Sequence, residues 1–188
     1  MHGIIGLDLF KDLIVEINYA TGFLRLTAPE KFKYKSCKKC EKLNLEFYNG
    51  KPYVNAKVEI NEKEIPVKLL IDSGGSDALS LFEEDSLGIK SGEIFFNDFL
   101  GHGLNVNIYG KRTKLKAFTL KSFILENANV AFPNTVNVFY AKQIKDRNGS
   151  ISGNILKRFN IIFNYQKAQM NIPKTVSIKK SLGITKAV

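Results

Sequence analysis

The feature that most constrains this chain is an internal repeat. Residues 3–19 match residues 149–165 when the sequence is shifted by 146 positions, from Gly3 to Gly149. Five of the twelve aligned pairs that are not identical set an apolar residue against an apolar residue. Identity occurs at Gly3, Ile5, Lys11, Asn18 and Tyr19, whose counterparts are Gly149, Ile151, Lys157, Asn164 and Tyr165. A unit that recurs at a fixed offset indicates that one local structure is built twice.

Each copy predicts the same succession of elements. The Gly-rich start is typical of a tight turn, and about seven residues of short helix follow. Apolar residues stand at every other position, at Leu13, Val15 and Ile17 in the first copy and at Phe159, Ile161 and Phe163 in the second. This spacing predicts a strand in each copy. A hairpin turn then leads into a last strand, over residues 23–26 in the first copy and 169–172 in the second. The chain therefore holds two copies of one terminal element.

The stretch between the copies is rich in strand signals. Asn49-Gly50 and residues 61–64 are typical of hairpin turns. Few helices are expected, and the strand count fits an all-β barrel or sandwich. Strands are predicted over residues 45–47, 53–60, 65–71, 94–99, 104–109, 113–120, 123–125 and 135–140.

The formal net charge is +10, and much of the excess lies in residues 31–42 and in the lysines of the tail after residue 173. Clustered basic residues can bind nucleic acid by releasing counterions from phosphate. A solvated linker and tail also account for this charge, and we favour that explanation. Because no recognition helix or aromatic stacking platform accompanies it, we expect no nucleic-acid partner.

No apolar run approaches the roughly 20 residues that cross a bilayer, so no membrane span is expected. The start lacks the basic end and cleavage site of a secretory signal, and it resembles the interior of a domain. If an upstream signal has been removed, a periplasmic or secreted location is expected. For Cys37 and Cys40 we expect a disulfide or inert thiols, with zinc and redox chemistry as alternatives. No metal or cofactor is expected.

One segment combines an apolar strand, a turn and an ionisable group. Residues 67–71 lead into Asp72, Ser73 and Gly74. Ser73 can hydrogen-bond neighbouring main chain, and Gly74 lets main-chain N–H groups approach the carboxylate. Such a turn would hold a carboxyl group rigidly at the mouth of a barrel. The alternative is an ordinary Asp-Ser-Gly turn that closes a hairpin.

Residues 70–75 resemble the active-site motif of pepsin-like and retropepsin-like aspartic peptidases. That motif has two apolar residues, Asp, Thr or Ser, Gly, and usually Ser, Thr or Ala, so Gly75 departs from it. A second family signature, an apolar pair before Gly and then a helix and a strand, is similar to residues 150–159. Ser152 is a polar departure there, and residues 3–10 match the signature better.

The resemblance implies an acid-protease β-barrel of the retropepsin or pepsin-lobe type, with one or two short helices. It implies that Asp72 is catalytic, supported by Ser73 and Gly74, and that the substrate is a peptide or protein. The Gly-punctuated hairpin with Gly101, His102 and Gly103 occupies the place of the family's flap. The implied organisation is a closing element of a preceding lobe (1–28), a basic linker (29–42), a lobe (43–173) and a basic tail (174–188).

Peptide hydrolysis in this family needs two Asp carboxylates, and no other Asp here has the context of Asp72. The resemblance therefore implies a second carboxylate from a missing N-terminal lobe or from a homodimer partner. The fragment alone is then expected to be inactive. Two alternatives remain: a catalytically inactive aspartic-peptidase-like binding domain, favoured by Gly75 and Ser152, and a basic nucleic-acid-binding β-domain.

Overall fold

The computed structural model describes residues 6–33, 40–103, 106–144, 146–173 and 184–186. The chain forms two compact units. Unit 1 comprises residues 1–54 and 156–178, and unit 2 comprises residues 55–155 and 179–188. The prediction of an all-β fold is confirmed, because strands dominate both units and the helices are short.

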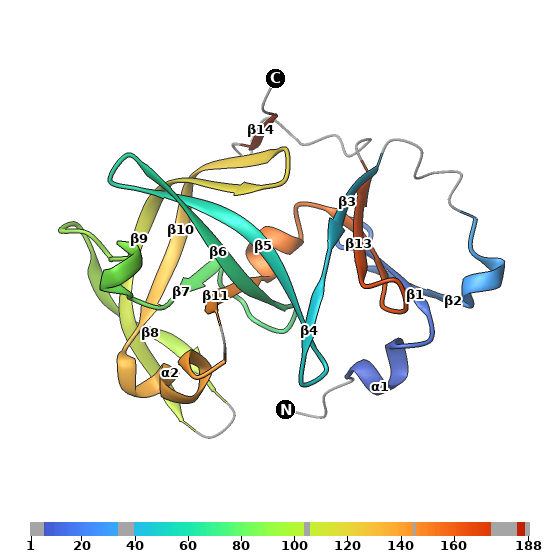
Figure 1. Cartoon of the computed structure of the whole chain (residues 1–188), viewed down its shortest axis with the longest axis horizontal. Helices are drawn as coiled ribbons and strands as arrows, with labels where there is room; N and C mark the ends of the chain where they lie inside the picture. The colour runs from blue at the N-terminus through green and yellow to red at the C-terminus, as the bar shows by residue number, and fades with distance from the viewer. Residues whose placement is uncertain (1–5, 34–39, 104–105, 145, 174–183, 187–188) are drawn as a thin grey trace. The chain divides into compact units, whose positions relative to one another are not determined.

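Unit 1 contains a five-stranded sheet in the order β2-β1-β12-β13-β3. Two of its hairpins are the two copies of the sequence repeat (Figure 1). The elements of unit 1 are α1 (Leu7–Phe10), β1 (Ile14–Asn18), β2 (Phe23–Thr27), the 3-10 helix η1 (Pro29–Lys31), β3 (Cys40–Asn44), β4 (Glu46–Tyr48), β12 (Asn160–Asn164) and β13 (Gln169–Pro173).

The two copies are related by a local two-fold axis. Strand β1 pairs antiparallel with β12, and Glu16 lies opposite Ile162, its own counterpart in the repeat. Both hairpins share one register, since Asn18 lies opposite Phe23 and Asn164 lies opposite the residue five positions after it. Equivalent residues that face each other across an axis define an isologous pairing. The sequence repeat is therefore a structural repeat.

Both copies of the repeat have Asn at the same position, Asn18 and Asn164, and in each copy this side chain binds the turn that follows. The side-chain Oδ1 of Asn18 accepts hydrogen bonds from the main-chain N–H groups of Ala20 and Thr21, at 3.0 and 3.2 Å. Oδ1 of Asn164 accepts one from the N–H of Lys167 at 3.0 Å. Asn side chains stabilise turns in this way. Each Asn thus fixes the turn that joins the two strands of its copy.

Unit 2 contains the second sheet, in the order β14-β10-β7-β11-β6-β5-β9-β8. Strand β5 and helix α3 cross the boundary between the units in sequence. The remaining elements are β5 (Lys51–Ile60), β6 (Lys63–Asp72), β7 (Leu79–Leu81), the 3-10 helix η3 (Asp85–Leu87), β8 (Phe96–His102), β9 (Asn107–Leu120), β10 (Phe123–Pro133), α2 (Thr135–Lys142), β11 (Arg147–Ser152), α3 (Gly153–Leu156) and β14 (Ile184–Lys186).

An additional pairing between β9 and β10 closes this sheet into a barrel. The two strands run side by side along their length (Figure 1). Closure removes the free edges that an open sheet would present. The barrel interior is apolar: Leu69, Leu79, Leu81 and Ile151 are completely buried. Alternate residues of β6 point into this core, and its last residue, Asp72, is exposed.

Three expectations about local structure are wrong. Residues 135–140 form helix α2 rather than a strand, and α2 brings the α-helices of the described chain to three. Asn137 explains the helix, because its side chain accepts from the N–H of Tyr109 at 3.4 Å and donates to the carbonyl of Asn107 at 3.3 Å. These contacts override the strand propensity of the β-branched residues.

The other two corrections concern strands. The Gly-rich start of the second copy was expected to be a tight turn, but it is strand β11, which pairs with β6 and β7. The corresponding part of the first copy, residues 3–5, lies outside the described residues. The strands expected over residues 104–109 and 113–120 are one strand, β9, which begins at Asn107, and residues 104 and 105 lie outside the described residues.

Candidate active site

The strand-end carboxylate predicted from the sequence lies at the end of β6. Oδ1 of Asp72 accepts hydrogen bonds from the main-chain N–H groups of Gly74 and Gly75, each at 3.1 Å. The N–H of Gly75 also approaches the carbonyl of Asp72 at 3.3 Å. Ser73 is exposed in the same turn. The main chain of the glycines, rather than the Ser73 hydroxyl, therefore fixes the carboxylate.

The second signature segment lies directly beside this turn. Strand β11 runs parallel to β6, and Ser152 is paired with Asp72. The N–H of Gly153 donates to the carbonyl of Gly75 at 2.9 Å, and the N–H of Ser152 donates to the carbonyl of Ala78 at 3.0 Å. A Cβ on Gly153 would lie 2.8 Å from that carbonyl of Gly75. The close approach of the two segments therefore requires glycine at position 153.

The two departures from the family motif meet at this point. A Cβ placed on Gly75 would lie 2.8 Å from Oγ of Ser152 and 3.1 Å from Oδ2 of Asp72. Ser152 is 3% exposed. Gly75 and Ser152 are therefore neighbours that fit each other, and the side chain of one fills the space that the other leaves open.

The hairpin of β8 and β9 carries the residues expected to form a flap. Gly101 has a φ of 137°, which disfavours any other residue. His102 is exposed, and its Nδ1 lies 2.8 Å from Oδ1 of Asn107 on the opposite strand. The ring of Phe99 packs edge-on against His102 and tilts against Tyr109, at centroid distances of 4.9 and 5.4 Å. The histidine is thus held within the hairpin.

An ion cluster that the sequence did not predict joins this hairpin to the Asp72 loop. Arg112 on β9 donates from Nη1 to Asp77 at 2.5 Å and from Nε to Asp98 on β8 at 2.8 Å. Burial alone would lower the pKa of Arg112, but the hydrogen bonds and charges of the two carboxylates outweigh burial and raise it. The guanidinium therefore stays charged and fixes the base of the hairpin to the loop after Asp72.

A pocket of about 370 Å³ lies beside this cluster. Its lining includes neither Asp72 nor His102. Aromatic and amide side chains contribute most of it, which suits binding of a side chain that is apolar with a polar end. The lining residues are Asn97, Asp98, Phe99, Tyr109, Gly110 and Asn134.

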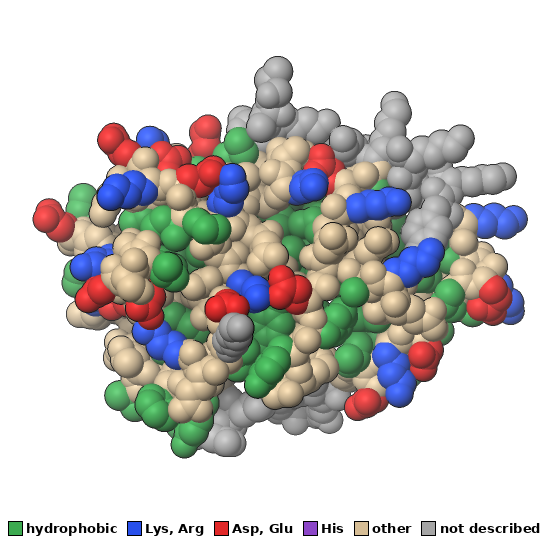
Figure 2. Space-filling model, viewed as in Figure 1, with side chains coloured by type: hydrophobic (Ala, Val, Ile, Leu, Met, Phe, Trp, Pro, Cys, Tyr) green, Lys and Arg blue, Asp and Glu red, His purple; other side chains and the backbone are tan. Residues whose placement is uncertain are grey.

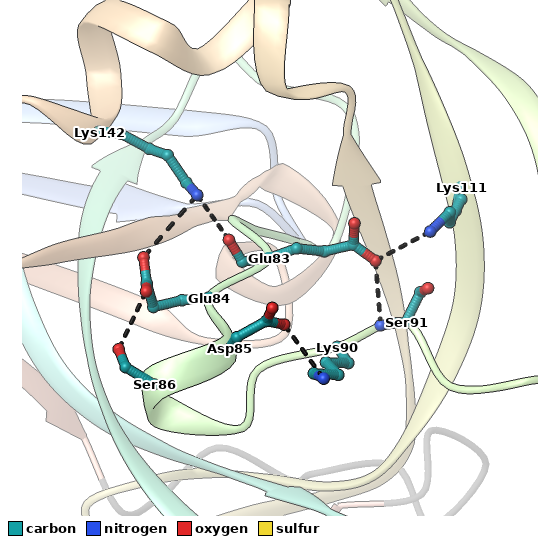
Figure 3. A network of polar contacts seen from close by, with 8 residues as sticks. All are labelled: Glu83, Glu84, Asp85, Ser86, Lys90, Ser91, Lys111 and Lys142. Carbon is teal, nitrogen blue, oxygen red and sulfur yellow. Dashed lines mark hydrogen bonds and ion pairs between the residues drawn. The ribbon is translucent and has the colours of Figure 1, made fainter.

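A second polar network stabilises the segment after β7 (Figure 3). Glu83 accepts from Nζ of Lys111 at 3.0 Å and from the N–H of Ser91 at 3.4 Å. Lys142 on α2 donates to the Glu83 carbonyl at 2.5 Å and lies 3.8 Å from the Glu84 carboxylate. Burial would raise the pKa of Glu83, but the bonds from Lys111 and Ser91 prevail and lower it. The network ties α2 and β9 to one loop.

The surface and the cysteines bear on the remaining expectations. The face drawn in Figure 2 shows Lys and Arg side chains interspersed with Asp and Glu, rather than a basic stripe.

Cys40 is disulfide-bonded, and Cys37 lies outside the described residues. Within the described residues, no group of three or more His, Cys, Asp or Glu side chains could hold a metal ion. None of the described helices has the length and apolar character to span a membrane.

Comparisons with known proteins identify a structural likeness. No protein-family model matches the chain, and no curated protein matches its sequence. Among solved structures, the chain is similar to a retropepsin-like aspartic protease from Rickettsia conorii, with 18% sequence identity and a TM-score of 0.49. The match covers 71% of this chain and 90% of that chain.

Proposed function

We propose that this chain carries one catalytic lobe of an aspartic endopeptidase, with Asp72 as its catalytic carboxylate. The observation that carries the proposal is the turn itself. A buried strand ends in an exposed Asp72 whose Oδ1 accepts two main-chain N–H groups. Among the described ion pairs, none involves Asp72. A carboxylate held rigidly by the main chain and left without a counter-ion is available for proton transfer.

The chemistry needs a second carboxyl group. Two carboxyl groups a few ångströms apart cannot both ionise, so they share one proton. The ionised group takes a proton from the water that attacks the peptide carbonyl carbon, and the protonated group donates to the carbonyl oxygen. Asp77 and Asp98 are committed to Arg112. Since no other Asp of the chain follows an apolar strand and precedes Ser-Gly as Asp72 does, we assign the partner carboxylate to a preceding lobe or to a second subunit.

The open edge of the unit 1 sheet is evidence for a partner lobe or subunit. On the second half of the sheet, the outer edge of β13 pairs with β3, and Met170 lies opposite Leu43. On the first half, β2 is the terminal strand of the sheet, and no described strand pairs with its outer edge. The local two-fold axis relates these two edges. An incoming strand with the alternation of β3 would complete the sheet symmetrically.

The exposure of equivalent side chains supports the same conclusion. Leu24 and Leu26 of β2 are 51% and 40% exposed. Their counterparts Met170 and Ile172 are 0% and 1% exposed. One half of a symmetric apolar face is thus buried while the other half is open. An open apolar face of this kind is typical of a surface that another body covers.

The β8–β9 hairpin is assigned the role of the flap. Gly101, which has a φ of 137°, lies toward the far end of the hairpin, and Arg112 fixes its base. A lid of this kind closes over an extended peptide and excludes water from the carboxylates. His102, which is exposed near the tip, is the side chain that we assign to substrate contact.

The test is hydrolysis of an unfolded protein at mildly acidic pH. With a second subunit as partner, the rate falls with the square of the chain concentration on dilution. With a preceding lobe as partner, the chain is inactive until a polypeptide that supplies that lobe is added. In either case Asp72→Asn reduces the rate by about 10²- to 10⁴-fold. A rate that stays proportional to concentration where the chain is monomeric would refute the proposal.

A catalytically inactive binding domain is the competing function. It predicts that the assembled protein, with both carboxylates present, neither cleaves unfolded protein nor binds a pepstatin-type inhibitor. Inhibitor binding that Asp72→Asn abolishes would exclude it. Persistent lack of binding would favour it over the peptidase.

A further inference from the structure

The side chain of Ser152 occupies the space beside Gly75 in which a Cβ atom would otherwise lie. A Cβ on Gly75 would lie 2.8 Å from Oγ and 3.0 Å from Cβ of Ser152. Cβ atoms do not approach other heavy atoms so closely, so glycine is the residue that fits while Ser152 is in place. Oδ2 of Asp72 borders the same space, 3.1 Å from that Cβ position. The serine hydroxyl and the second carboxylate oxygen therefore border one small volume.

The position of Ser152 is fixed by its strand. Ser152 is almost fully buried, is paired with Asp72 across β6 and β11, and donates its main-chain N–H to Ala78 at 3.0 Å. The carboxylate is fixed on one side only, because both main-chain donors of the turn bind Oδ1. Among the described residues, no hydrogen bond to Oδ2 accompanies these two. A buried hydroxyl beside it would supply one.

We propose that Ser152 is a positioning residue for Asp72, and that its hydroxyl donates to Oδ2 of the ionised carboxylate from the place that a side chain at position 75 would occupy. The role in catalysis rests on the proposed function. Charged groups on the adjacent elements are engaged elsewhere: Asp77 pairs with Arg112, and Arg147 on β11 lies over the ring of Phe82 at 5.2 Å. Ser152 then controls the orientation and reactivity of the carboxylate.

The first test removes the hydroxyl. Ser152→Ala is compared with Ser150→Ala, which deletes another buried hydroxyl from β11 at a position paired with Leu70 instead of Asp72. The readouts are the ¹³Cγ resonance of Asp72 and the rate at which an epoxide esterifies Asp72, followed by peptide mass spectrometry. Loss of a hydrogen bond to the carboxylate is expected to raise the esterification rate by about threefold or more in Ser152→Ala. Ser150→Ala is expected to leave both readouts unchanged.

The second test moves the CH₂OH group from one strand to the other. Gly75→Ser alone places a side chain where Ser152 already lies, so we expect a lower melting temperature than wild type. Gly75→Ser combined with Ser152→Gly vacates that space and restores a hydroxyl beside Oδ2. The double variant is expected to recover melting temperature over Gly75→Ser and to bring the esterification rate back within about twofold of wild type. A purely structural serine would not restore the reactivity of Asp72.

Three results would overturn the proposal: equal esterification of Ser152→Ala and Ser150→Ala, Gly75→Ser as stable as wild type, or a double variant whose Asp72 reacts like that of Ser152→Ala. If Gly75→Ser does not fold, the double variant and Ser152→Ala still decide the matter. These readouts need no peptide hydrolysis. Failure of the peptidase assay alone would therefore refute the proposed function and leave the role of Ser152 beside Asp72 standing.

Discussion

The local two-fold axis of the unit 1 sheet provides a matched pair of substitutions, Met170→Ala and Leu24→Ala. The two positions are counterparts in the repeat, yet Met170 is 0% exposed and Leu24 is 51% exposed. Truncating a fully buried Met costs about 2–5 kcal/mol, because transfer and cavity terms add. Leu24 has about half of its burial to lose, so its truncation should cost about 1 kcal/mol or less. The free energies of unfolding should differ by at least about 1 kcal/mol between the variants.

The assay is urea denaturation of each variant, followed by far-ultraviolet circular dichroism, with unchanged slopes as the condition for comparison. Equal destabilisation by the two substitutions would mean that Leu24 is covered in the chain as it stands, and would refute the open-face interpretation. A further measurement tests the partner. Once a partner lobe or subunit is bound, Leu24→Ala is expected to weaken its binding by about tenfold, which corresponds to about 1.4 kcal/mol.

Three further predictions concern unit 2. Glu83→Gln should destabilise the protein by up to about 1 kcal/mol at neutral pH, since the pair with Lys111 is partly screened by solvent. The pKa of Glu83 in the folded protein is lowered from its ordinary value of 4.5. The difference in stability between wild type and Glu83→Gln is therefore present above pH 4.5 and disappears as the pH falls through the folded pKa. Thermal melts of both proteins across this pH range measure it. Gly153→Ala should lower the free energy of unfolding by about 1–3 kcal/mol, because the new Cβ would lie against the carbonyl of Gly75. The control Gly6→Ala, at a position with open space around it, should not lower it. Arg112→Lys should loosen the hairpin base, visible as faster amide exchange in β8, because Lys cannot hold two carboxylates with a planar fork; unchanged exchange would contradict this.

The sequence predicted the parts of the fold that depend on local pattern. The repeat predicted two equivalent hairpins, and their shared register follows because Asn18 and Asn164 cap equivalent turns. The turn at Asp72 was also predictable, because an apolar strand before Asp-Ser-Gly is a local signal. In both cases the residues that determine the structure lie within a few positions of one another.

The parts that were missed depend on long-range contacts. Strand β11 looks like a turn because of Gly149, but that glycine is needed where the strand passes close to the main chain of Ser80. Helix α2 follows from contacts that Asn137 makes with β9, about 30 residues away. Arg112 was not singled out for the same reason, because its two carboxylates lie on a loop and a neighbouring strand.

The departures from the aspartic-peptidase motif at Gly75 and Ser152 are not two independent signs of lost catalysis, because the two residues are in contact in the folded chain. Taken one at a time, Gly75 and Ser152 each favour a lobe that has lost its chemistry. In the folded chain they are one feature, since a side chain is absent at position 75 where the side chain of Ser152 lies. A side chain at position 75 would clash with Ser152, and an apolar residue at 152 would leave no hydroxyl beside Gly75 on β11. Gly75 and Ser152 therefore count as one departure from the motif rather than two, because the side chain of Ser152 lies where a side chain at position 75 would be.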